Sequence, residues 1–187
     1  MSTIIEHLVK GEVMQMKIPT AHESSEYHMM QYYLKKNHYK TGSLMANSCM
    51  STALLNHHSP EQIQAAYLYG KHIGSAFQLV DDVLDFEGVN TGKPALADLR
   101  EGISTAPVLF AAAEFPHLYT LMSRRFSGPG DVDEAVEILS RSGGVQATKA
   151  LALAEAELAV DAIMTLKPSI YRDALVHLAQ KVITRTS

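Results

Sequence analysis

The sequence of 187 residues has no tryptophan, only one cysteine, and no apolar run as long as the ~18 residues of a membrane-spanning helix. The single Cys49 excludes an internal disulfide and is interpreted as a core residue in a reducing compartment. A net charge of −4 gives no electrostatic reason to expect a nucleic-acid partner. The nine histidines form no HxxxH or HExxH pair, so no zinc motif is predicted.

Aspartate is absent from the first 80 residues, and then Asp81, Asp82 and Asp85 follow one another inside an apolar segment. Acids in the last turn of a helix face the negative end of its dipole, which costs roughly 0.3–1 kcal/mol each where exposed. Like charges four residues apart repel by about a further 0.2–0.5 kcal/mol. These penalties favour a bound cation, and carboxylate ligands favour magnesium or calcium. The alternative is a set of solvated acids at a helix end.

Long amphipathic segments and the absence of alternating strand patterns predict an all-α protein with one domain over residues 1–187. Ser59 and Gln62 predict a capping box at the start of one helix, and Asp131 and Glu134 predict a second one. The expected helices cover about 2–17, 25–39, 41–57, 60–86, 105–114, 116–125, 131–141, 144–165 and 169–184.

The helix expected at 60–86 carries two parallel stripes. Ile73, Phe77, Val80 and Leu84 form an apolar ridge, because their spacing places them on one face. A polar stripe lies about 100° around the helix axis, and glycine at its start leaves room above it. Its members are Gly74, Gln78, Asp81 and Asp85. We interpret this stripe as the wall of a wet cavity.

Five ordered segments resemble the trans-type polyprenyl diphosphate synthases, and together they cover nearly the whole chain. Phe77-Gln78 followed by Asp81-Asp82-x-x-Asp85 resembles the second aspartate-rich motif of that family. Gly92-Lys93-Pro94 is similar to the lysine loop that comes next. Tyr39-Lys40-Thr41-Gly42 resembles the family's Lys-Thr helix, and Gly11-Glu12 the segment before it. The carboxyl-terminal third is similar to the long-chain, mitochondrial synthases that make the ubiquinone side chain.

This resemblance implies an isoprenoid synthase-like helical bundle and assigns roles to individual residues. Asp81, supported by Asp82 and Asp85, would hold Mg²⁺ bound to the diphosphate of an allylic substrate. The residues implied to bind that substrate, or to act in catalysis, are Lys40, Thr41, Phe77, Gln78 and Lys93. Metal ions and lysines aimed at the departing oxygens would stabilise the transition state in which the allylic cation forms.

The family's first aspartate-rich motif is absent from these 187 residues, and so is its Gly-Gly-Lys-Arg segment. The chain therefore resembles the carboxyl-terminal portion of a synthase, and no stand-alone activity is expected. Three explanations stay open. The first is that the chain is half of a split synthase, in a homo- or hetero-oligomer with a partner that carries the missing half. The second is that it is the remainder of a longer polypeptide. The third is a non-catalytic structural subunit of a larger, mitochondrial assembly. The mitochondrial location is implied by the resemblance alone, because no targeting peptide is visible.

Overall fold

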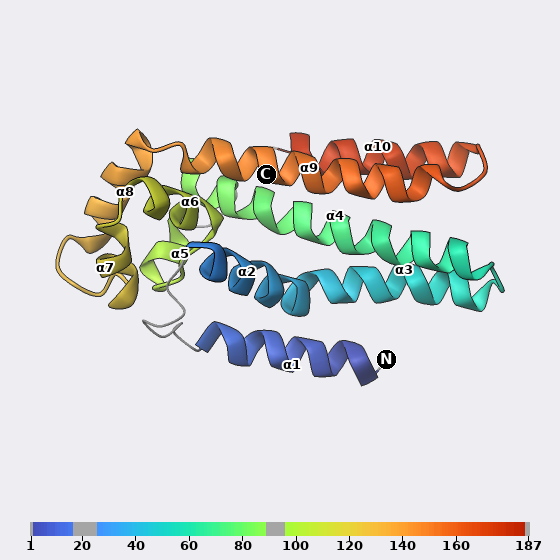
Figure 1. The fold of residues 1–187 in the computed structure, drawn as a ribbon, viewed down its shortest axis with the longest axis horizontal. Helices are drawn as coiled ribbons and strands as arrows, with labels where there is room; N and C mark the ends of the chain where they lie inside the picture. The colour runs from blue at the N-terminus through green and yellow to red at the C-terminus, as the bar shows by residue number, and fades with distance from the viewer. Residues whose placement is uncertain (1, 17–25, 89–95, 186–187) are drawn as a thin grey trace. The chain divides into compact units, whose positions relative to one another are not determined.

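The structure, a computed structural model, describes residues 2–16, 26–88 and 96–185. Every regular secondary-structure element in these ranges is helical, which confirms the predicted all-α class (Figure 1). No helix in the same ranges is both long and apolar enough to cross a membrane. The helices are α1 (Ser2–Met16), α2 (Glu26–Asn37), the π-helix η2 (His38–Gly42), α3 (Ser43–Leu55), α4 (Pro60–Glu87), α5 (Ala97–Arg100), α6 (Ala106–Glu114), α7 (Leu118–Ser123), α8 (Asp131–Arg141), α9 (Gly144–Met164) and α10 (Ile170–Thr184).

The chain divides into two compact units. Unit 1 contains residues 1–17, 34–78 and 151–185, and therefore α1, η2, α3, α10 and most of α4 and α9. Unit 2 contains residues 18–33 and 79–150, with most of α2, α5 to α8, the end of α4 and the start of α9. Each unit has its own buried side chains.

The π-helix η2 replaces the helix break that was predicted near residue 40. The backbone N–H of Ser43 donates to the carbonyl of His38, five residues earlier, so the chain stays helical from α2 through to α3. The predicted interruption between 39 and 41 is therefore wrong. One extra residue in a helical turn changes the direction of the following side chains without a proline or a loop. The hydrophobic periodicity of the sequence contains no signal for that extra residue.

Close backbone contacts surround η2 in unit 1. A Cβ atom on Gly74 of α4 would lie 2.8 Å from the Cα of Gly42 in η2. A Cβ atom on Gly11 of α1 would lie 2.8 Å from the backbone nitrogen of Lys40. The space above Gly74, expected to be part of a wet cavity, is therefore filled by backbone. Glycine at these positions lets α1 and α4 approach η2 more closely than any larger residue allows.

The core of unit 1 lies where α4 meets α9 and α10. Tyr69 and Ile73 of α4 pack with Ala159 and Ile163 of α9 and with Val182 of α10. The Tyr69 hydroxyl donates to the carbonyl of Leu175 at 2.9 Å, which satisfies its polar end. Burial raises the pKa of Tyr69 to about 12. Figure 1 shows α9 and α10 running beside the first half of α4.

The start of α4 follows the predicted capping box. The backbone N–H of Ser59 donates to Gln62 Oε1 at 3.0 Å, and the N–H of Gln62 donates to Ser59 Oγ at 3.4 Å. These two bonds satisfy N–H groups that have no partner inside the helix. The sequence therefore located this helix start correctly.

The capping box predicted for Asp131 in unit 2 is wrong. Gly130, with φ of 83°, is the residue before α8, and it supplies no side-chain cap. The Asp131 carboxylate instead accepts hydrogen bonds from Arg124 Nε at 2.7 Å, Arg124 Nη2 at 2.6 Å and the Gly128 N–H at 2.9 Å. The Arg124 guanidinium holds the pKa of Asp131 below its usual range. This bidentate pair fixes the turn between α7 and α8.

We predict that Gly74→Ala lowers the free energy of unfolding by about 1–3 kcal/mol, because the added methyl group overpacks the contact with Gly42. Urea denaturation measures the change, with the exposed Gln64→Ala on the same helix as the control. A stabilisation of about 1 kcal/mol, which helix propensity alone would give, contradicts the close contact.

Candidate functional site

The predicted site residues that the structure describes lie in two groups of side chains, one in each unit. The first group centres on η2 in unit 1. Lys40 Nζ donates to Gln15 Oε1 at 2.9 Å and lies 3.3 Å from Glu12 Oε1, so α1 holds the ammonium group in place. Thr41 Oγ1 donates to Gln78 Oε1 at 3.3 Å, which joins η2 to α4. The structure thus places Lys40, Thr41 and Gln78 on neighbouring elements of unit 1.

Phe77 contacts Arg185, a residue for which no role was predicted. The guanidinium carbon of Arg185 lies 3.9 Å from the centroid of the Phe77 ring, a cation–π contact. Arg185 Nη2 also donates to the Phe77 carbonyl at 3.2 Å. The two contacts tie the residue after α10 to α4, and they fix the ring of Phe77 next to Gln78.

The second group contains the aspartates at the end of α4 in unit 2. Asp82 is buried, with 3% of its surface exposed. Its Oδ2 atom accepts hydrogen bonds from the Tyr33 hydroxyl and, at 3.1 Å, from the backbone N–H of Ala106. Asp82 therefore joins the end of α4 to α2 and to the first turn of α6. A buried carboxylate with these donors stabilises the site, and little of its surface remains for a ligand.

Asp85 organises the short helix α5. Its Oδ1 accepts from the N–H of Ala97 at 3.0 Å, and its Oδ2 accepts from the N–H of Asp98 at 3.3 Å. The Asp85 carbonyl also accepts from the N–H of Leu96 at 3.0 Å. The carboxylate thus satisfies N–H groups at the start of α5, where negative charge is favourable. The sequence reading missed α5, because a helix of four residues leaves no periodic pattern.

Asp98 joins this acidic group, although no role was predicted for it. Burial raises the pKa of Asp98 to about 6, and the charges of Asp85, Asp82 and Asp81 raise it in the same direction. Negative charge is therefore concentrated at the end of α4. A divalent cation bound there would offset it, so the donor set suits a hard metal ion such as Mg²⁺.

The acidic group does not form a complete metal cage. Among the described residues, no three histidine, cysteine, aspartate or glutamate side chains converge closely enough to hold a metal ion by themselves. Asp81 is exposed, whereas the carboxylate oxygens of Asp82 and Asp85 accept hydrogen bonds from protein N–H and O–H groups. The arrangement fits an ion that brings other ligands with it, such as diphosphate oxygens and water. Lys93, the remaining predicted residue, lies outside the described residues.

Three residues of these groups had weak or absent signals in the sequence. Tyr33 and Arg185 meet their partners across 49 and 108 positions, so only folding reveals the pairs. Asp98 does follow the lysine loop in the sequence, and its position 13 residues after Asp85 was the one signal available.

We predict that Asp82→Ala strongly destabilises the protein, whereas Asp81→Ala does not. Losing the Asp82 carboxylate leaves the buried Ala106 N–H and the Tyr33 hydroxyl without this acceptor, at about 1–3 kcal/mol for each group. Asp81 is exposed, so its removal should change the free energy of unfolding by no more than about 0.5 kcal/mol. Urea midpoints of the two variants measure the difference, and equal midpoints would rule out a structural role for Asp82.

We predict that Asp98→Asn stabilises the metal-free protein above pH 6. The pKa of Asp98 is raised on folding, so the contribution of Asp98 to stability is most favourable below pH 4 and is lost as the pH rises through about 6. Since asparagine does not ionise, the variant should gain on the order of 2 kcal/mol at pH 8 relative to wild type. Thermal unfolding at pH 4 and pH 8 in EDTA measures the gain. A gain of the same size at both pH values would contradict the raised pKa.

Comparison with known proteins gives the context for both groups. The chain is 45% identical to the mitochondrial solanesyl-diphosphate synthase 1 of Oryza sativa, over all of this chain and 44% of that protein. A structure of an Arabidopsis medium/long-chain prenyl pyrophosphate synthase without ligands is 41% identical, with a TM-score of 0.88, over all of this chain and 64% of that one. A polyprenyl synthase of Caulobacter crescentus, complexed with calcium and isoprenyl diphosphate, is 30% identical with a TM-score of 0.84. It is matched over all of this chain and 58% of that one.

These similarities confirm the predicted isoprenoid synthase-like fold. The chain spans less than half the length of the curated relative from rice. The sequence pattern that defines the family described as polyprenyl synthetase matches residues 1–139. This match covers well over half of the chain, and the segments with Lys40, Thr41, Gln78 and the three aspartates lie inside it. The chain belongs to the polyprenyl synthetase family.

Proposed function

We propose that this chain supplies the half of a trans-polyprenyl diphosphate synthase site that contains the second aspartate-rich motif. Such a synthase elongates an isoprenoid chain. Membership in the polyprenyl synthetase family supports the reaction class. The observation that carries the assignment is the division of labour among the aspartates. Asp82 and Asp85 are held by protein donors, whereas Asp81 is exposed near the end of α4.

The allylic diphosphate is the proposed substrate, and its recognition uses charge of both signs. The ammonium groups of Lys40 and Lys93 would pair with diphosphate oxygens. Thr41 would contribute its hydroxyl, and Gln78 and Phe77 would line the site. Glu12 and Gln15 hold Lys40 in position in unit 1, and its third ammonium hydrogen remains for a phosphate oxygen. A donor fixed before the substrate binds loses little entropy in binding it.

Mg²⁺ bound through Asp81, with Asp82 and Asp85 in support, would neutralise the charge that develops on the diphosphate as it leaves. The chain's own residues then have two tasks, which are to hold the diphosphate and to keep the carboxylates oriented. The calcium and isoprenyl diphosphate bound to the Caulobacter relative support this choice of ligands. Attack by the double bond of isopentenyl diphosphate on the allylic cation and loss of a proton would complete the reaction.

The complete reaction needs a first aspartate-rich motif and a Gly-Gly-Lys-Arg segment, and these 187 residues contain neither. We propose an oligomer in which a partner chain carries both. The similarity to a mitochondrial solanesyl-diphosphate synthase supports a mitochondrial location and a product used as the side chain of ubiquinone.

We expect a non-hydrolysable allylic diphosphate analogue to bind the purified chain only in the presence of Mg²⁺. Isothermal titration should give one saturable site, and Asp81→Ala and Lys40→Ala should each weaken binding at least tenfold, about 1.4 kcal/mol. The control is Asp133→Ala, which removes an exposed acid from α8.

Binding that survives Asp81→Ala unchanged, or that needs no magnesium, would contradict the proposed site. If the isolated chain does not bind, the same titration on the chain in its native assembly decides between the alternatives. Binding there would show a site that forms on assembly. No binding there would favour a non-catalytic structural subunit.

A further inference from the structure

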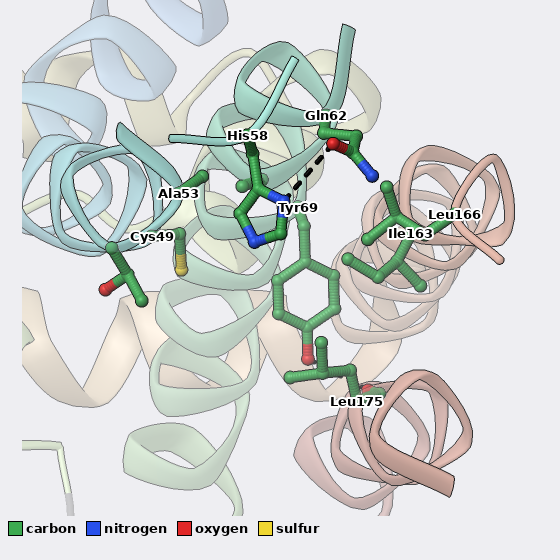
Figure 2. A pocket seen from close by; sticks show the side chains of 10 residues that line it. Cys49, Ala53, His58, Gln62, Tyr69, Ile163, Leu166 and Leu175 are labelled. Atoms are coloured by element: carbon green, nitrogen blue, oxygen red, sulfur yellow. Dashed lines mark hydrogen bonds between the residues drawn. The ribbon is translucent and has the colours of Figure 1, made fainter. Parts of the chain in front are cut away.

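A cavity of about 310 Å³ lies in unit 1, at the end where α4 begins, and no role in the proposed reaction involves it. It is lined by residues of α3, the first half of α4, the end of α9 and α10 (Figure 2). Its volume is at the lower end of the range for small-molecule sites in proteins. At about 30 Å³ for each water-sized group, it has room for roughly ten such groups.

The inner wall of the cavity is apolar. Ala53, Tyr69 and Ile163 are buried, and Leu166 and Leu175 also line the wall. Figure 2 shows these side chains around the same space. The Tyr69 hydroxyl is bonded to the Leu175 carbonyl, so it offers little to a ligand. Such a wall favours a hydrocarbon chain over a polar or charged group.

The rim of the cavity is polar. Thr52 and His58 are exposed, and Gln62 is partly exposed. His58 Nδ1 lies 3.2 Å from Gln62 Oε1, so the two side chains hold each other at the rim. Gln62 Oε1 also accepts from the Ser59 N–H, which anchors it to the start of α4. Hydroxyl, imidazole and amide groups can donate to or accept from one hydroxyl head group.

Two apolar side chains on helices that line the cavity are exposed. Leu55 follows the rim segment of α3 and is 80% exposed, and Ile170 at the start of α10 is 77% exposed.

We propose that this cavity binds a single apolar chain of about ten carbons, with a hydroxyl head group held at the rim by Thr52, His58 and Gln62. The chain would lie against Ala53, Ala66 and Leu175, where it displaces poorly bound water. Both branched isoprenoid alcohols and straight-chain alcohols share this chemistry. The proposal does not depend on the proposed function, because an alcohol lacks the diphosphate that the aspartates would bind through a metal ion.

The test is isothermal titration of the purified chain, in EDTA, with geraniol and with decan-1-ol. We expect saturable binding of at least one alcohol with a stoichiometry of one. A clear preference for geraniol identifies isoprenoids as the source, whereas a preference for decan-1-ol identifies straight-chain lipids. Ala66→Leu, which fills the cavity, should weaken binding at least tenfold. The matched control Ala154→Leu adds the same side chain to an exposed position on α9 and should leave binding unchanged.

Cys49 provides a second measurement on the wild-type chain, so the test does not depend on variants that must fold. Its thiol lines the cavity, and burial raises its pKa, so alkylation is best followed near pH 9. The bound alcohol should slow alkylation at least fivefold. The absence of saturable binding by both alcohols, or unchanged alkylation at saturation, would overturn the proposal. Equal weakening by Ala66→Leu and Ala154→Leu would overturn it too.

Discussion

Unit 1 depends on one steric constraint, the approach of α4 to η2 at Gly74 and Gly42. The contact leaves no room for a Cβ atom on Gly74, so the distance between the two backbones is set by the absence of a side chain. Thr41 reaches Gln78 because of this approach, and Gly11 allows the backbone of α1 to lie equally close to Lys40. Two residues of the proposed substrate site are thus positioned by the glycines beside them.

The π-helix η2 is a second case in which local geometry serves a site. Its extra residue lies in the turn that carries Lys40 and Thr41, and such turns are frequent at functional sites. A regular α-helix from residue 26 to 55 would rotate every side chain after the turn by about 100°. The π turn therefore sets which face of α3 meets α4, besides presenting the lysine.

In unit 2 the acidic motif has a structural role in addition to its proposed role in binding. Asp82 joins three segments and Asp85 organises α5, so two of the three carboxylates are held in place by hydrogen bonds within the protein. Fixed carboxylates lose little freedom when a cation arrives, which favours binding. Their mutual repulsion, and that with Asp98, is lowest when a divalent ion is present. The same charges are thus unfavourable without a ligand and favourable with one.

The sequence by itself determined the helical class, the start of α4, the family and the identity of most candidate residues, because periodicity, capping chemistry and ordered motifs are local along the chain. It was wrong about the break near residue 40 and about the cap at Asp131, and it did not reveal α5. Only the tertiary structure decided that Asp82 is buried while Asp81 is exposed, and that Tyr33 and Arg185 belong to these groups. Neighbouring aspartates look alike in a sequence, and burial and pairing across many residues depend on how the helices pack.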